Sequence, residues 1–163
     1  MKKYIQVEKF INEKNLKKYF DRLYPICRSI LGKGFRDSLE IIGEIVDLNK
    51  KKVKSGTNVL DWTVPDEWNI NDGYIITPSG KKIAKFKDHT LHIVNYSTPI
   101  NKKINLEELK KHLHTLPSQP KAIPYVTSYY KRNWGFCLSY DEYKNLEEGT
   151  YTVFIDSTIE PGY

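Results

Sequence analysis

Two groups of aromatic side chains in this sequence could bind a sugar or a peptide. The segment DWTVPDEW at 61–68 holds two tryptophans on a loop that a proline restricts, and YYKRNW at 129–134 adds two tyrosines, an arginine and a tryptophan. Aromatic faces stack on sugars and on peptide side chains, and an arginine fork binds carboxylates. The alternative is that the two tryptophans anchor long loops to a β core. The candidate substrate-binding residues are Trp62, Trp68, Tyr129, Tyr130, Arg132 and Trp134.

The four histidines do not form a recognisable metal motif. A zinc site needs three or more ligands that converge on one point. His89 and His92 flank a predicted strand with a spacing that points them to opposite faces. His112 and His114 end a predicted helix, and they would converge in an extended conformation. The candidate metal ligands are therefore His112 and His114, with surface or hydrogen-bonded histidines as the alternative.

No catalytic residue is predicted in this chain. Cys27 and Cys137 lie in apolar surroundings with no partner base, as expected of inert free thiols. The GKG at 32–34 is a turn and not a phosphate-binding loop. The carboxylates at 61, 66, 67 and 72 are spaced as in residues that fix turns, although a hydrolase pocket is the alternative.

The length and composition are those of one domain outside the membrane, or of a small domain with an extension. The chain has 163 residues, 39% hydrophobic and 28% charged, with a net charge of +6. No apolar run approaches the ~20 residues of a membrane helix, and the first residues lack a signal-peptide core, which predicts a cytoplasmic protein without a membrane partner. Residues 1–54 hold 14 Lys and Arg against 7 Asp and Glu. A solvated helical surface explains this excess at least as well as nucleic-acid binding, which would be salt-sensitive.

Hydrophobic periodicity predicts an α+β chain. Residues 5–30 are helical, with a break at Pro25, and residues 36–48 form the clearest helix. From Lys52 onward, turn residues and β-branched or aromatic side chains indicate a β-rich module. The expected strands are 74–77 and 82–86 (a hairpin), 90–96, 134–138 and 150–157; short helices are expected at 105–112, behind Asn105 as N-cap, and after Ser139.

Three stretches carry a resemblance to a known family. They are LYPICRSILGKGFRDSLEII at 23–42, SGTNVLDWTVPDEWNINDGYI at 55–75 with HIVNYSTPI at 92–100, and HTLPSQPKAIPYVTSYYKRNWGFCLS at 114–139. The chain resembles the N-terminal region of bacterial aminopeptidase-like proteins. These combine an M28-type zinc-peptidase fold with an inserted domain of unknown function, of the DUF4910 or DUF2172 type.

The resemblance implies the N-terminal portion of a larger α/β protein, a zinc-dependent aminopeptidase-like hydrolase. Residues 1–50 would be a helical segment of the peptidase-like domain, 51–133 an inserted β-rich module, and 134–163 the strand-helix-strand return. The module would be a lid or substrate-selecting cover. Zinc would be bound by His, Asp and Glu residues beyond this chain, which on its own has no cofactor and is not catalytically complete. Related proteins occur alongside polysaccharide biosynthesis, so the substrate would be a peptide or a glycan-related small molecule.

Two alternatives stay open. The chain could be a stand-alone module that binds a glycan or peptide through an aromatic cleft. As a fragment, it would expose apolar faces of its helices and last strand, and it would need a partner. That partner is either the missing C-terminal peptidase-like part or a second copy of the chain.

Overall fold

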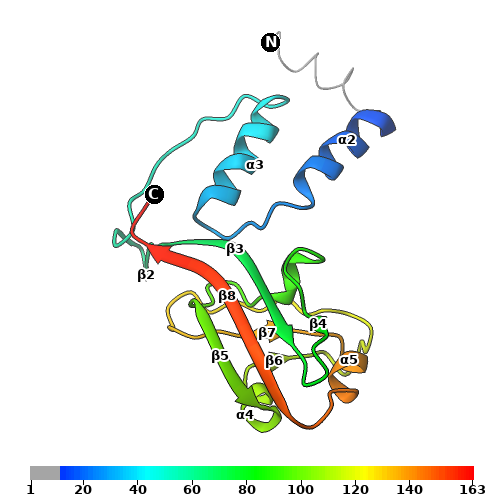
Figure 1. Cartoon of the computed structure of the whole chain (residues 1–163). Helices are drawn as coiled ribbons and strands as arrows, with labels where there is room; N and C mark the ends of the chain where they lie inside the picture. Colours follow the sequence, from blue (N-terminus) through cyan, green and yellow to red (C-terminus); the bar gives the residue numbers. More distant parts are fainter. Residues whose placement is uncertain (1–11) are drawn as a thin grey trace. The chain divides into compact units, whose positions relative to one another are not determined.

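The computed structural model describes residues 12–163, which divide into two compact units (Figure 1). Unit 1 contains the described residues up to Glu67 together with Pro161–Tyr163, and unit 2 is Trp68–Glu160. Helices and several sheets are both present, so the α+β prediction is confirmed. The predicted division into a peptidase-like helical segment (1–50), an inserted module (51–133) and a return to the peptidase-like domain (134–163) stays a prediction.

Unit 1 contains two helices whose bounds differ from those predicted. Helix α2 is Glu13–Leu23, with Asn12 as N-cap, and α3 is Lys33–Gly43. The helix predicted at 5–30 extends too far toward the C-terminus, because Pro25 cannot continue the hydrogen-bonded ladder. Residues 5–11 of that prediction lie outside the described residues. The helix predicted at 36–48 begins earlier, at Lys33, and ends earlier, at Gly43. From Glu44 the chain continues as turn and coil.

A bidentate ion pair connects the two helices of unit 1. Both guanidinium nitrogens of Arg22 donate to the Glu44 carboxylate at 2.6 Å, and the Tyr19 hydroxyl also donates to it. The hydrogen bond from Arg22 lowers the pKa of Glu44 to about 2. Strands β1 (Asn58–Val59) and β2 (Trp62–Thr63) form a small antiparallel hairpin in the same unit.

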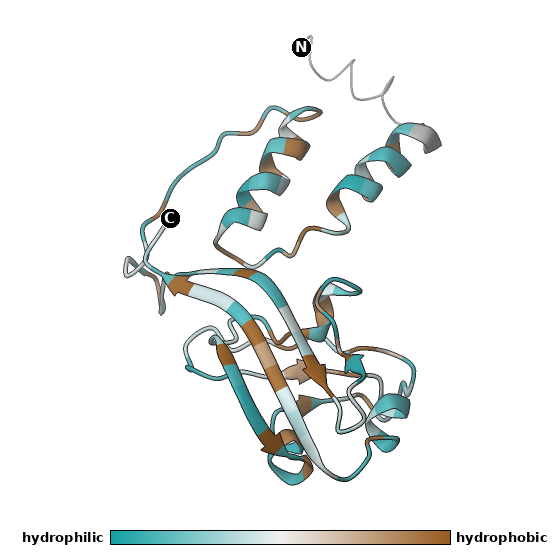
Figure 2. Cartoon of the chain, viewed as in Figure 1, coloured by the Kyte–Doolittle hydropathy of each residue, from teal (hydrophilic) through white to brown (hydrophobic). Residues whose placement is uncertain are grey.

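Unit 2 contains a four-stranded sheet in the order β4-β3-β8-β5 (Figure 1). The strands are β3 (Glu67–Ile76, whose first residue belongs to unit 1), β4 (Lys82–Ile83), β5 (Ile100–Asn105) and β8 (Thr150–Glu160). Burial alternates along β8, where Tyr151, Val153, Ile155 and Ser157 face the core. Figure 2 shows the hydrophobic residues along these strands. The pairing of Ile75 with Ile83 confirms the predicted hairpin, but its second strand is Lys82–Ile83 rather than 82–86 and its first strand begins earlier than 74. The last strand is longer than predicted.

The prediction of a strand at 90–96 is wrong. Thr90–His92 is a short 3-10 helix (η1), because the His89 ring accepts a hydrogen bond from the Leu91 amide. Residues 93–98 follow as single bridges to a distant loop: Ile93 to Phe136, Asn95 to Thr127 and Ser97 to Asn133. These non-local bridges order the segment 127–136 and cannot be recognised from local periodicity.

Short elements complete unit 2. Helix α4 (Leu106–Lys110) is capped by Asn105, and α5 (Tyr140–Lys144) has a capping box between Ser139 and Glu142, as the residue types predict. Strands β6 (Leu113–His114) and β7 (Phe136–Cys137) pair in parallel. The predicted helix 105–112 therefore ends early, with His112 in the turn after α4 and His114 in β6, and the strand predicted at 134–138 is shorter.

Ser97 is the centre of a buried hydrogen-bond network in unit 2. Its carbonyl accepts from Trp68 Nε1 at 2.9 Å and from Ser157 Oγ at 2.7 Å. Its hydroxyl donates to the Val94 carbonyl at 2.6 Å and accepts from the Gly135 amide at 3.2 Å. Ser97 is fully buried. The network therefore joins β3, β8 and the 126–136 loop through one residue.

Both cysteines are free thiols in protected positions. Cys137 is fully buried in β7, and burial raises the pKa of its thiol to about 12. Cys27 lies between α2 and α3 rather than on the predicted helix face, and burial raises its pKa to about 11, partly offset by Arg28. Neither thiol has the lowered pKa of a reactive cysteine.

We expect Ser97→Ala to destabilise the chain by about 1–3 kcal/mol, because the buried Gly135 amide loses its acceptor. Urea unfolding monitored by tryptophan fluorescence measures the change. The matched control is Ser118→Ala at an exposed serine of the same unit, which should stay within about 0.5 kcal/mol. Equal unfolding midpoints for the two variants would contradict the role given to Ser97.

We expect both thiols of the native chain to react slowly with iodoacetamide at pH 8. Their raised pKa values leave little thiolate, and Cys137 is also shielded from the reagent. Mass spectrometry of labelled peptides should show Cys27 reacting before Cys137, and both reacting rapidly in urea. Rapid native labelling of Cys137 would show that β7 opens easily.

Candidate functional site

An aromatic surface of unit 2 is built from the loop 125–134. Tyr125 is 58% exposed and Tyr130 is 64% exposed. The Tyr125 hydroxyl accepts a hydrogen bond from Asn95 Nδ2 at 3.2 Å, which fixes its position against the 93–98 segment. Arg132 is exposed in the same loop. This surface therefore offers two tyrosine faces and a guanidinium on one ordered loop.

Beneath this surface an aromatic row leads into the core. The Tyr129 ring meets the Tyr96 ring edge-on with centroids 5.0 Å apart, and Tyr96 in turn stacks on Trp68 at 6.0 Å. Burial, followed by a hydrogen bond with Tyr125, raises the pKa of Tyr129. Trp68 is only 3% exposed, so its indole packs inside unit 2 and has little surface for a ligand.

Tyr96 was not among the residues predicted to bind substrate, yet its ring contacts those of two that were, Tyr129 and Trp68. Tyr96 is 1% exposed and has φ of 66°, a left-handed conformation that is unusual for a bulky residue. Its packing between two aromatic rings holds the ring in place. No local pattern around residue 96 signals this conformation, because it depends on the bridges of the 93–98 segment.

Trp134 lies against a histidine. Its ring is parallel to that of His112, with centroids 3.7 Å apart and an interplanar angle of 14°. The His112 ring also hydrogen-bonds through Nδ1 to the Trp134 carbonyl at 3.0 Å. One indole face is thus covered by His112, which leaves less of Trp134 for a ligand than the exposed tyrosines offer.

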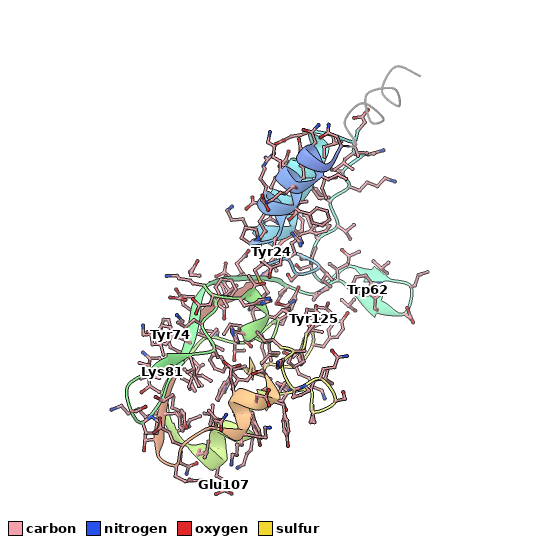
Figure 3. The ribbon with its side chains drawn as sticks, turned by 90° about the vertical axis from the view of Figure 1, so that its right-hand side faces the viewer. Tyr24, Trp62, Tyr74, Lys81, Glu107 and Tyr125 are labelled. Carbon is pink, nitrogen blue, oxygen red and sulfur yellow. The ribbon has the colours of Figure 1, made fainter. Side chains whose placement is uncertain are left out.

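Trp62 belongs to the other unit. It lies on the β1–β2 hairpin of unit 1, where it is labelled in Figure 3, and it is 43% exposed. The structure therefore groups Trp68, Tyr129, Tyr130, Arg132 and Trp134 within unit 2, and Trp62 lines a separate hollow described below. The substrate-binding role of all six residues stays a prediction.

Three of the four histidines, His89, His92 and His112, hydrogen-bond to backbone groups. Burial lowers the pKa of His114, and the neighbouring His112 lowers it further. His112 Nε2 lies 3.7 Å from Glu108, and His92 Nδ1 lies 2.9 Å from the Cys137 carbonyl. Among residues 12–163, no three His, Cys, Asp or Glu side chains converge as metal ligands do. His112 and His114 alone do not provide the ligand number that zinc requires.

Two of the four carboxylates singled out in the sequence, Glu67 and Asp72, accept hydrogen bonds from the backbone. Asp72 accepts from the Gly73 amide at 2.9 Å and pairs with Lys87. Glu67 is 8% exposed, and its carboxylate accepts from the Arg36 guanidinium and from the Tyr163 amide. The described residues thus provide an ordered surface, and among them no group of three metal-ligating side chains converges. No described helix is both long enough and apolar enough to cross a membrane.

The chain is similar to a relative of known sequence and to a solved crystal structure. It is 49% identical over 142 residues to a proposed polysaccharide-biosynthesis protein with an aminopeptidase-like domain from Clostridium acetobutylicum. That match covers 87% of this chain and 33% of the relative. The chain also superposes, with a TM-score of 0.86 and 44% identity, on the crystal structure of a proposed peptidase from Clostridium acetobutylicum. This second match covers 98% of this chain and 37% of the crystallised one.

The chain thus spans about a third of the length of the relatives it matches. A family model described as a domain of unknown function, DUF2172, matches residues 67–158. This region runs from the first residue of β3 to near the end of β8, so it corresponds closely to unit 2. It covers more than half of the sequence and confirms the resemblance to a DUF2172-type domain. The chain therefore belongs to the DUF2172 family.

Proposed function

We propose that this chain is the N-terminal, non-catalytic part of an M28-type, zinc-dependent aminopeptidase-like hydrolase of the cytoplasm. The main support is the match to the crystal structure, in which nearly the whole chain corresponds to 37% of a proposed peptidase. The chemistry would then reside in the remainder of that longer protein. An inserted DUF4910-type module, as suggested by the sequence, is part of the same proposal.

The metal of such a hydrolase would be bound outside the described residues. Residues 12–163 contain no group of three convergent ligands, so they do not fit a catalytic zinc site. No catalytic step is assigned to His112 or His114. The contribution of this chain is to bind, orient or exclude substrate.

Unit 2 is proposed as the lid or substrate-selecting cover. Its surface presents Tyr125 and Tyr130 with Arg132 on a loop that the Ser97 network fixes to the sheet. A preorganised surface loses little conformational entropy when it binds a ligand. Tyrosine faces suit sugars and peptide side chains, and the guanidinium suits a carboxylate. We therefore propose a small peptide or glycan-related substrate, consistent with the polysaccharide-biosynthesis name of one relative.

The partner proposed for unit 1 is the rest of the longer protein. Unit 1 leaves several large apolar side chains exposed, among them Phe20 at 70% and Leu60 at 99%. Exposed apolar groups gathered on one unit are typical of surfaces that contact further protein. A second copy of this chain is the alternative partner.

The exposed tyrosines also favour a second candidate, a stand-alone glycan- or peptide-binding module. Such a module would bind its ligand with the 163-residue chain alone. The hydrolase proposal instead requires the missing part for turnover.

A chimera distinguishes these functions. This chain replaces the matching 142-residue region in the Clostridium acetobutylicum relative, and hydrolysis of aminoacyl-coumarin and aminoacyl-sugar substrates is compared with that of the unmodified relative. We expect EDTA-sensitive hydrolysis by both proteins and none by the 163-residue chain with added zinc. Hydrolysis by the short chain alone, or none by the unmodified relative, would contradict the proposal.

Within the chimera, we expect Tyr130→Ala to raise KM about three- to tenfold with kcat unchanged, because an exposed stacking face contributes about 0.5–1.5 kcal/mol to binding. The control is Tyr24→Ala, which removes an equally exposed tyrosine (70% against 64%) from unit 1. If KM were the same in both variants, the proposal that the 125–134 surface binds substrate would be contradicted.

A further inference from the structure

Unit 1 contains a hollow of about 510 Å³ whose lining residues all belong to that unit. Ligand pockets are commonly of about 300–1,000 Å³, so the volume suits a small molecule. The hollow lies between α3 and the segment 50–64. Its apolar lining includes Leu31, Phe35, Leu39, Val53, Val59, Trp62 and Val64.

The apolar lining is partly open to solvent. Phe35 is 40% exposed, Val53 is 42% exposed and Trp62 is 43% exposed, and all three border the same hollow. Large apolar side chains scattered singly need no explanation, whereas a group around one concave site indicates a binding surface. An occupant with an apolar body would remove this surface from water.

The rim of the hollow carries an excess of positive charge. Lys50 pairs with Glu40 and Arg36 pairs with Glu67, so these two cations are largely neutralised. Lys51 and Lys52 also border the hollow, and no carboxylate in the described part of the chain pairs with either. Lys52 Nζ lies 4.0 Å from the centroid of the Tyr163 ring, which holds the ammonium at the rim.

We propose that this hollow binds an amphiphilic anion, with the apolar body among Phe35, Leu39 and Trp62 and the acidic head group beside Lys51 and Lys52. The apolar floor and the cationic rim together supply both parts of this recognition. Neither a neutral apolar ligand nor a strongly polar anion uses both. The acidic group could be that of a free acyl chain or the carboxylate of an apolar peptide.

The charged fluorescent probe anilinonaphthalene sulfonate and its neutral analogue phenylnaphthylamine test the proposal on the 163-residue chain. We expect one sulfonate molecule bound per chain, with energy transfer from tryptophan that decreases in Trp62→Phe, because this variant removes the donor that lines the hollow. In K51Q/K52Q the dissociation constant of the sulfonate should rise about three- to tenfold, as expected for two exposed charge contacts. The dissociation constant of the neutral analogue should change by less than about twofold.

The control is K102Q/K103Q, which neutralises an equally exposed pair of adjacent lysines in unit 2 and should leave both probes unchanged. Circular dichroism establishes that each variant is folded. Sulfonate binding that is absent, insensitive to K51Q/K52Q or equally weakened by K102Q/K103Q would overturn the proposal.

Competition identifies the source of the anion. Decanoate is compared with decanol, and acetyl-leucyl-leucine with its amide, each as a competitor of the bound sulfonate. Displacement by either carboxylate but not by its neutral analogue supports the proposal and names the source. Equal displacement by the neutral analogues, or none by the carboxylates, would overturn it. These outcomes do not depend on hydrolase activity, so the hollow can be a binding site whether or not the proposed function holds.

Discussion

The carbonyl oxygen of Ser97 accepts hydrogen bonds from two side chains on different strands, Trp68 on β3 and Ser157 on β8. The same residue's hydroxyl satisfies the Gly135 amide in the distant loop. A buried polar group without a partner is costly, so these groups constrain one another strongly. Gly135 is suited to this position because a Cβ there would lie 3.0 Å from the His112 backbone oxygen. The sheet and the covering loop are thus positioned through a single buried residue.

This constraint explains how the irregular loop 125–134 can present a defined surface. The loop contains no strand and therefore no regular ladder of hydrogen bonds of its own. It is held instead by single bridges to residues 93–98 and by the aromatic row from Trp68 through Tyr96 to Tyr129. The exposed Tyr125 and Tyr130 therefore project from an ordered base. Such a base is what a cover over a substrate requires, because binding then needs little reordering.

Local chemistry made much of this fold predictable. The N-caps at Asn105 and Ser139, the hairpin around Gly80 and the alternation in β8 all depend on residues close in sequence. The segment 90–96 was wrongly predicted as a strand because its partners lie some 30 to 40 residues away. The helix bounds near Pro25 and Gly43 were wrong because apolar periodicity continues past the last hydrogen-bonded turn. For the candidate site, residue types identified the aromatic loop, but neither Tyr96 nor the covering of Trp134 by His112 could be seen without the tertiary structure.

The central claim is that this chain works as part of a longer hydrolase, consistent with relatives of which it spans about a third. The intact mass of the native protein, captured from its own cells with an antibody against unit 2 and measured by mass spectrometry, tests this most directly. We expect a polypeptide well above 19.1 kDa, with further protein joined to these two units. A native mass near 19.1 kDa would contradict it, and would leave a binding module as the function of this chain.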